Sequence, residues 1–249
     1  MTKIGFIGAE LLICAALSSC AHSPVNDPSD PMEGMNRAVF SFNESVDRFF
    51  AEPVAEGYEI VVPETARTGV TNFFDNLDTP TAIVNDVLQG KILQSGLDSC
   101  RFVFNTVVGL AGFVDAASMI GLEKHEEDFG QTFGVWGIGN GAYLMLPFFG
   151  PTTNRDLTGS IFSLSTNPTT YVAPELGIPL TAISSVDDRS QLLGTEGILE
   201  QQLDRYIFVR NAYVQQRQNL VYNGHPPIEQ LDFNGDGDDT SSPTQKPLP

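Results

Sequence analysis

Apolar residues recur at helical spacing along most of this chain, but polar residues repeatedly interrupt the stretches that carry them. In the first such stretch, steps of four and three residues separate Met35, Val39, Phe42, Val46 and Phe49. This spacing places all five side chains on one face of a helix. After the first twenty residues, no segment has the roughly 18 uninterrupted apolar residues that a membrane-spanning helix needs. The pattern predicts a mainly α protein built from amphipathic helices.

The same spacing predicts further helices over residues 64–74, 81–89, 92–108, with a continuation toward 119, and 199–221. Gly224, followed by two prolines, would end the last one. Residues 157–179 are rich in Ser, Thr and Pro, and we expect irregular turns with little helix there. Residues 102–120 are mostly apolar but include Asn105 and Asp115. These polar residues indicate a buried or water-lined helix face, and the core helix of a soluble domain fits this segment equally well.

The N-terminus has the pattern of a secretory signal. Lys3 precedes an apolar stretch over residues 4–17, which is too short to span a bilayer. The stretch ends in Leu17-Ser18-Ser19-Cys20, which resembles the lipobox at which bacterial lipoproteins are cleaved and acylated on the cysteine. The alternative is an ordinary signal peptide with an incidental cysteine, and Glu10 within the apolar stretch favours that alternative.

Four regions follow from this organisation. We expect a lipoprotein signal peptide over 1–19, a lipidated tether over 20–31, a helical domain over 32–224 and an acidic disordered tail over 225–249. Lipidation of Cys20 would anchor the protein, because buried acyl chains contribute roughly 0.8 kcal/mol per CH₂ group. Cys100 would then be the one remaining thiol, so no intramolecular disulfide is expected.

The charge balance limits the partners. The chain has 13 basic and 31 acidic residues and a formal net charge of −18. Such a charge repels phosphate backbones, so we expect no nucleic-acid partner. It also argues against attachment to anionic headgroups by charge alone. The 17 phenylalanines indicate either a well-filled core or apolar faces presented to lipid.

A glycine-rich segment over residues 129–151 breaks the helical pattern. Its second part, from Ala142 to Pro147, is apolar, and Gly150 follows, so the segment is expected to form a turn or hairpin. Residues 137–142 formally match the dinucleotide fingerprint G-x-G-x-x-G/A. We reject that interpretation, because the fingerprint requires a helix that opens at the glycines.

Motifs for catalysis and metal binding are scarce, and no cofactor is expected. The run that begins at His125 resembles the start of H-E-x-x-H, but Phe129 stands at the second histidine position, so we interpret His125 as an exposed loop residue. The acidic tail contains half of a calcium loop, with Pro243 in place of the bidentate glutamate. This half-site predicts either weak calcium binding or only a solvated tail; its candidate ligands are Asp232, Asn234, Asp236 and Asp238.

The ordered set of motifs over residues 30–222 resembles the MlaA (VacJ) lipoproteins of the Gram-negative outer membrane. The residues that carry the resemblance include Asp30-Pro31-Met32-Glu33-Gly34-Met35-Asn36-Arg37, Phe42-Asn43, Asn72-Phe73, Leu88-Gln89-Gly90, Arg101-Phe102, Phe129-Gly130, Leu146-Pro147-Phe148, Arg155-Asp156 and Tyr206-Ile207-Phe208-Val209-Arg210-Asn211-Ala212-Tyr213. The half calcium loop falls outside the family pattern.

The resemblance implies a compact, ring-like, mostly helical protein with a Gly-rich hairpin, seated in the periplasmic-side leaflet of the outer membrane. It further implies a channel that removes mislocalised phospholipid from the outer leaflet and passes it to a periplasmic carrier of the MlaC type. A trimeric porin is the expected membrane partner. Alternatives of other classes are a membrane-tethered lipid hydrolase and an envelope scaffold that transports nothing.

The expected channel and gating residues lie in the hairpin and on the first helix. Within the hairpin, glycines would permit hinge motion while Tyr143, Leu144 and Leu146 line an apolar wall. On the first helix, Phe42 and Asn43 match the region where the family sets channel opening, although the apolar stripe also makes Phe42 a packing residue. The other residues of the expected site are Gly134, Gly137, Gly139, Gly141 and Pro147. The Arg155–Asp156 pair is expected to be a local salt bridge.

Overall fold

The computed structural model describes residues 28–227. Helices make up most of this part of the chain, so the mainly α prediction is confirmed. The signal peptide, Cys20 and the half calcium loop at Asp232, Asn234, Asp236 and Asp238 lie outside the described residues. In chain order the helices are α2 (Glu33–Val46), α3 (Glu52–Val61), α4 (Glu64–Leu88), α5 (Ile92–Val107), α6 (Phe129–Val135), α7 (Asn154–Ser163), α8 (Pro174–Ser190), α9 (Glu196–Glu200) and α10 (Arg205–Val221), and the strands are β1 (Tyr143–Leu146) and β2 (Gly150–Thr153).

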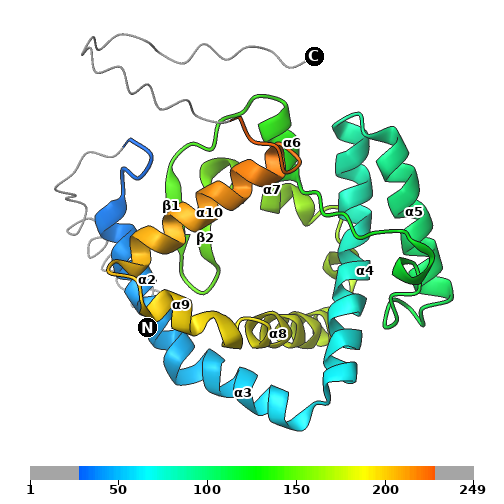
Figure 1. The fold of residues 1–249 in the computed structure, drawn as a ribbon, viewed down its shortest axis with the longest axis horizontal. Coiled ribbons are helices and arrows are strands. Elements are labelled where there is room, and N and C mark those ends of the chain that lie inside the picture. Colours follow the sequence, from blue (N-terminus) through cyan, green and yellow to red (C-terminus); the bar gives the residue numbers. More distant parts are fainter. Residues whose placement is uncertain (1–27, 228–249) are drawn as a thin grey trace, which may run out of the picture.

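The elements follow one another around a ring (Figure 1). A π-helical turn over Asp47–Ala51 connects α2 to α3, α3 packs on α8, and α8 packs on α4. On the other side α6 packs on α7, and α10 returns across α6 and β2. Helix α5 packs against α4 on the outside of the ring (Figure 1). The expected ring-like bundle with a hairpin is therefore present.

The polarity of this fold is inverted relative to an ordinary soluble domain. Among the described residues, 19 polar or charged residues are buried but only eight hydrophobic ones are, whereas a soluble core is dominated by aliphatic side chains. Helix α5 shows the inversion directly, because Ser95, Asp98, Arg101 and Asn105 form its buried face. Its apolar residues point outward, and Leu93, for example, is 80% exposed. The expected buried polar face around Asn105 is thus present.

A small aromatic cluster holds the hairpin to the last helix. Tyr143 and Met145 of β1 pack with Tyr206 of α10, and all three are buried. The rings of Tyr143 and Tyr206 meet edge to face with centroids 6.1 Å apart, a favourable aromatic geometry. The guanidinium of Arg37 lies 4.6 Å from the centroid of the Tyr206 ring. This cluster fixes the position of the hairpin in the ring.

Two regions that were predicted to lack helix are helical. Helix α4 runs unbroken from Glu64 to Leu88, with Pro80 inside it, where two separate helices were predicted over 64–74 and 81–89. Residues 157–179 are also largely helical, in α7 and α8. Hydroxyl groups there bond the carbonyl four residues earlier, as Ser160 does to Asp156. Because these hydroxyl groups find hydrogen-bond acceptors within the helix itself, a Ser- and Thr-rich segment can remain helical.

Other boundaries shift less. Helix α5 ends at Val107 and does not continue to 119, because Leu110 and Ala111 adopt positive φ angles of 56° and 61°. The segment expected to be entirely hairpin begins instead with α6. The final helix begins at Arg205, where Asp204 caps it by accepting a hydrogen bond from the backbone NH of Ile207. No helix within residues 28–227 combines the length and the apolar character needed to cross a bilayer.

Candidate functional site: an anchored hairpin and a polar cavity

The β1–β2 hairpin presents an apolar tip. Its strands pair antiparallel, with Leu146 opposite Gly150. The turn between them contains Phe148 at a φ of 67° and Phe149. Their side chains are 73% and 87% exposed. Two adjacent exposed aromatic rings at a turn are unusual on a surface that faces only water.

Two asparagines of α2 hold this hairpin. The Asn36 Nδ2 donates to the Tyr143 carbonyl (3.1 Å), and its Oδ1 accepts from the Met145 NH (2.9 Å). Asn43 repeats the arrangement three strand residues further on, with its Nδ2 donating to the Leu146 carbonyl (2.9 Å) and its Oδ1 accepting from the Phe148 NH (2.9 Å).

The repeat works because the helix and the strand have matching lengths. Seven helical residues, from Asn36 to Asn43, rise about 10.5 Å, and three strand residues advance about 10 Å. Asn36 therefore replaces the backbone of a neighbouring strand beside Tyr143 and Met145, whereas Asn43 binds the end of β1, where the chain enters the turn. Asn36 is completely buried and also donates to Asp30 (2.7 Å), a residue that was assigned to the tether but is buried within the domain.

Phe42 contacts the same turn. Its ring meets that of Phe148 edge to face, with centroids 5.3 Å apart. Phe42 remains 45% exposed, so it packs on the hairpin tip while still contributing to the outer surface. The two residues singled out on the first helix, Phe42 and Asn43, are therefore the ones that bind the hairpin turn.

The expected hairpin residues separate into different environments. Tyr143 is only 2% exposed, so its side chain packs in the core and does not line an open wall. Leu144 and Leu146 are half-buried, Pro147 is exposed, and Leu146 lines a cavity between the hairpin and α7. The glycines also separate: Gly134 belongs to α6, whereas Gly137, Gly139 and Gly141 lie in the connection to β1, where Gly137 and Gly141 adopt positive φ angles.

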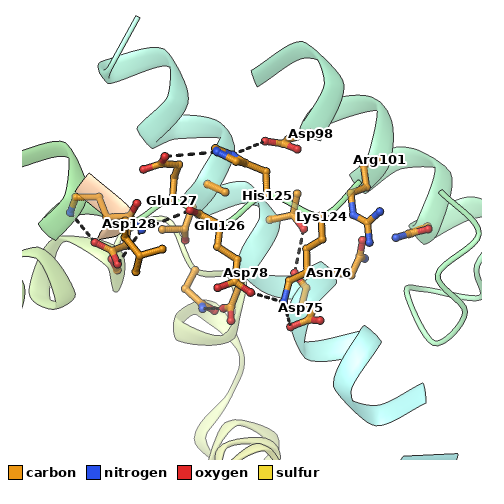
Figure 2. A pocket seen from close by; sticks show the side chains of 18 of the residues that line it. Asp75, Asn76, Asp78, Asp98, Arg101, Lys124, His125, Glu126, Glu127 and Asp128 are labelled. Carbon is orange, nitrogen blue, oxygen red and sulfur yellow. Dashed lines mark hydrogen bonds and ion pairs between the residues drawn. The ribbon is translucent and has the colours of Figure 1, made fainter. Parts of the chain in front are cut away.

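A polar cavity of about 420 Å³ lies between α4, α5, α6 and α10 (Figure 2). The segment over residues 124–128 runs along it and contributes Lys124, His125 and Glu126. Lys124 and two arginines line the cavity, but carboxylates outnumber them. The seven carboxylates are those of Asp75, Asp78, Asp98, Asp115, Glu126, Glu127 and Asp128. Burial is the main cause that raises the pKa of Asp78 to about 6. The excess of carboxylates makes the cavity acidic.

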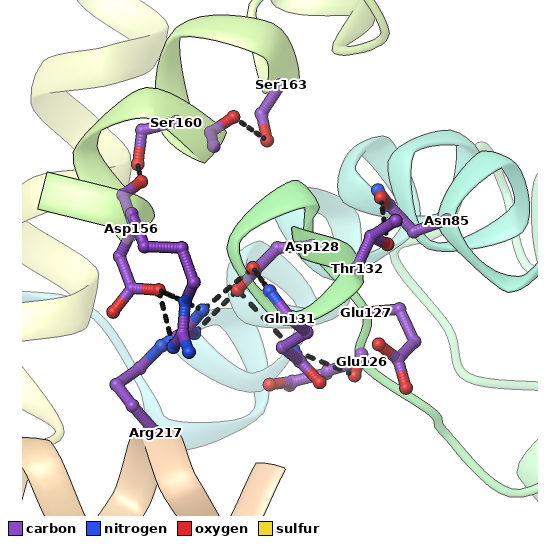
Figure 3. A network of polar contacts seen from close by, with 12 residues as sticks. Asn85, Glu126, Glu127, Asp128, Gln131, Thr132, Asp156, Ser160, Ser163 and Arg217 are labelled. Carbon is purple, nitrogen blue, oxygen red and sulfur yellow. Dashed lines mark hydrogen bonds and ion pairs between the residues drawn. The ribbon is translucent and has the colours of Figure 1, made fainter. Parts of the chain in front are cut away.

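One end of the cavity is closed by a network around Arg217 of α10 (Figure 3). The Arg217 guanidinium bonds both Asp128 carboxylate oxygens (2.6 and 2.8 Å) and Asp156 (3.1 Å). Asp156 also accepts from the Tyr213 hydroxyl (2.9 Å). Arg155 pairs with Asp156 (2.9 Å), so the expected local salt bridge forms, but as part of this larger network.

The charges in this network determine its pKa values. Burial alone would raise the pKa values of Asp128 and Asp156, but the charge and hydrogen bonds of Arg217 outweigh burial and lower both. A comparable group lies near the other end of the cavity, where Arg101 pairs with Asp115 (2.7 Å). Burial is again outweighed there, because hydrogen bonds from Ser118, Arg101 and Asn105 lower the pKa of Asp115 to about 2.

His125 does not have the exposed position predicted for it. Its Nδ1 lies 3.4 Å from Asp98 and 3.6 Å from Asp86, and its Nε2 lies 3.6 Å from Glu127. Asp86 and Asp98 come from different helices, α4 and α5, so no local motif could indicate this cluster. Asn36 and Asn43, by contrast, carry a readable signal, since two asparagines seven residues apart share one face of a helix.

Comparisons with known proteins identify relatives of this chain. The family model described as MlaA lipoprotein matches residues 28–220. The chain is 37% identical over 224 residues to the intermembrane phospholipid transport system lipoprotein MlaA of Shigella flexneri and of Escherichia coli (strain K12), covering 88% of this chain and 87% of each relative. The Haemophilus influenzae protein of the same name is 33% identical over 228 residues, covering 86% and 89%.

A solved structure described as "Structural basis for maintenance of bacterial outer membrane lipid asymmetry" is similar, with a TM-score of 0.72 and 36% sequence identity. The similarity covers 78% of this chain and 99% of that one. The fold over most of this chain is therefore similar to that of a solved structure.

Replacing Arg217 with Met should destabilise the protein at neutral pH. The change removes the counter-charge of Asp128, which is 38% exposed, and one of the two arginines that face the buried Asp156. We therefore expect a cost of roughly 2 kcal/mol, below that of breaking a fully buried pair. Because the folded-state pKa values of both aspartates are lowered, the stabilisation is present above their unfolded value of about 3.9 and is lost as the pH falls through the folded values. Unfolding of both proteins, measured from pH 7 to pH 3, should show a difference that shrinks below pH 4.

Arg205→Met is the matched control on the same helix. Arg205 pairs with Glu44 at the surface, where both side chains are more than 30% exposed, and such pairs contribute at most about 1 kcal/mol. Equal destabilisation by the two substitutions, or a difference independent of pH, would contradict the assignment of the buried network.

Proposed function

The chain belongs to the MlaA lipoprotein family, and from this membership we propose that it takes part in the phospholipid transport that maintains the lipid asymmetry of the bacterial outer membrane. The names of its relatives refer to intermembrane phospholipid transport, and the description of the similar solved structure refers to outer-membrane lipid asymmetry. The observation that carries the proposal is the inverted polarity of the ring, because such a protein offers lipid an apolar exterior and a polar interior at the same time.

The outward apolar side chains support a position within a membrane. Large exposed hydrophobic residues occur on most elements, with Ile60 of α3, Leu93 of α5 and Ile161 of α7 as examples. Exposing these side chains to water would be unfavourable, by about 25 cal/mol for each Å² of apolar surface. We propose that they face acyl chains in the periplasmic-side leaflet, and that the acylated Cys20 adds an anchor.

The interior supports a path for a lipid headgroup. A phospholipid that changes leaflet needs polar surroundings for its headgroup and apolar surroundings for its tails. In our proposal the headgroup passes along the polar interior of the ring, while Leu144, Leu146 and the hairpin tip provide the apolar wall. The hairpin tip, bound to α2 by Asn43, would control the opening, and the glycines at 137, 139 and 141 would serve as a hinge in the connection that precedes β1.

The direction of transport and the partners complete the proposal. Phospholipid mislocalised in the outer leaflet would enter the ring and pass from the ring to a periplasmic carrier of the MlaC type. A trimeric porin would hold the protein in the membrane. The acidic cavity would favour a headgroup that carries an ammonium group, because opposite charges attract most strongly where water is limited.

The Asn43→Ala variant tests the role of the hairpin anchor. It removes two hydrogen bonds from the turn, each with a net contribution of about 1 kcal/mol, and should loosen the tip without unfolding the ring. We expect an altered amount of phospholipid in the outer leaflet of cells that carry the variant, measured by selective labelling of surface-exposed lipid. Ser41→Ala, an exposed position on the same helix, is the control. Unchanged lipid asymmetry in the Asn43 variant, with normal protein levels, would refute the gating role.

Photocrosslinking tests the lipid path itself. A photoreactive amino acid in place of Phe149, at the exposed hairpin tip, should capture phospholipid in native membranes, whereas the same probe at the exposed Glu200 of α9 should capture much less. Captured lipid should be chemically intact. Equal capture at both sites would favour a scaffold without a path, and release of fatty acid or headgroup by the purified protein would indicate a hydrolase.

A further inference from the structure

The cluster around His125 contains buried polar atoms that nothing in the described part of the chain satisfies. Asp86 is completely buried, and neither of its carboxylate oxygens has a hydrogen-bond partner. The same is true of Asp98 Oδ2 and His125 Nδ1. A buried carboxylate without a partner is costly, because it has lost its hydration without compensation. Asp86 Oδ1 and Asp98 Oδ2 approach His125 Nδ1 to 3.6 and 3.4 Å without forming a hydrogen bond, so these facing ligand-type atoms indicate a missing group.

The geometry and charge of the cluster match a cation. Asp86, His125 and Glu127 each offer one ligand atom, and these atoms lie within 4.8 Å of one another. Asp98 approaches His125 Nδ1 to 3.4 Å (Figure 2), close to the ligand–ligand spacing of about 3.3 Å in a tetrahedral site with bonds near 2.0 Å. The three carboxylates and the facing Lys91 ammonium leave a charge of −2 when His125 is neutral, which a divalent ion balances.

The surroundings are organised as they are in metal sites. Glu127 is held by Lys91 (2.5 Å) and Gln89 (2.6 Å), and its carboxylate faces His125 Nε2 while Asp86 and Asp98 face Nδ1. A carboxylate behind the far ring nitrogen fixes the orientation of a ligating imidazole. The polar cavity, which His125, Asp98 and Glu127 also line, provides an entry route for an ion.

We propose that Asp86, Asp98 and His125, with Glu127 as a ligand or as the support of the imidazole, form a binding site for one divalent transition-metal ion such as Zn²⁺. The imidazole favours Zn²⁺ over Mg²⁺ and Ca²⁺, which prefer all-oxygen ligands. A bound ion would tie α4 and α5 to the segment that contains His125 at the wall of the polar cavity. This site is independent of the transport proposal.

The site can be tested by isothermal titration calorimetry, in which Zn²⁺ is titrated into the chelator-treated full-length protein. We expect one ion per chain, loss of that binding in Asp86→Asn and His125→Gln, and retention in the control Glu126→Gln. Glu126 lines the same cavity but is 66% exposed and pairs with Lys124. A hundredfold excess of Mg²⁺ or Ca²⁺ should not displace the zinc.

Thermal unfolding provides a second readout that does not depend on calorimetry. Zn²⁺ should raise the melting temperature of the wild type and of Glu126→Gln but not that of Asp86→Asn, which should fold at least as well as the metal-free wild type because it removes a buried charge. Absence of zinc binding to the wild type would overturn the proposal. Undiminished binding to Asp86→Asn and His125→Gln would also overturn it, because the zinc would then occupy other residues.

Discussion

Hydrogen bonds between buried polar side chains hold this ring together, because the interior contains few apolar side chains that could do so. The buried faces of α4 and α5 carry asparagine, aspartate, serine and threonine, and Arg217 of α10 joins α6 to α7 through Asp128 and Asp156. Each buried polar group needs a partner, since an unpaired one costs about 1–3 kcal/mol. These hydrogen-bonded networks specify a single arrangement of the helices. Replacing one residue of a network leaves its buried partner without a hydrogen bond.

The same constraint explains how a small hairpin can be placed accurately in an open ring. A two-stranded hairpin is marginally stable alone, but Asn36 and Asn43 extend its hydrogen bonding onto α2, and Tyr143 and Tyr206 pack it on α10. The strands are thereby fixed while the tip, with Phe148 and Phe149, stays exposed. An anchored base with an apolar tip suits an element that contacts lipid without losing its position.

The sequence predicted the helical class and the interrupted amphipathic faces correctly, because periodicity records which residues share a face. Around Asn105 it indicated a buried polar face, but for the other helices it did not reveal which face points inward. The stripe from Met35 to Phe49 would be a core stripe in a soluble protein, but here Asn36 is the buried residue of α2 and Phe49 is 82% exposed. Polar stretches such as 75–80 were interpreted as breaks for the same reason, since polarity usually marks a surface.

Parts of the candidate site could not be predicted from local sequence patterns. Phe42, Asn43 and the hairpin could be nominated from family resemblance, and the structure brings them into contact. Asp86, Asp98 and His125 meet only because α4 and α5 pack side by side, so neither spacing nor composition could nominate them. Arg217 lies 89 residues from Asp128, and only the return of α10 across α6 joins them.

Whether the apolar exterior of the ring faces lipid can be measured directly at Cys100. This thiol is exposed on the outward face of α5 and is the cysteine expected to remain free once Cys20 is acylated. A nitroxide attached to Cys100 in the mature protein, reconstituted in bilayers, can be examined for relaxation by oxygen and by a water-soluble nickel complex. If the exterior faces lipid, relaxation by oxygen is expected to be strong and relaxation by nickel weak, as in a hydrocarbon environment. Strong relaxation by nickel, equal to that of a label in free solution, would contradict a lipid-facing exterior.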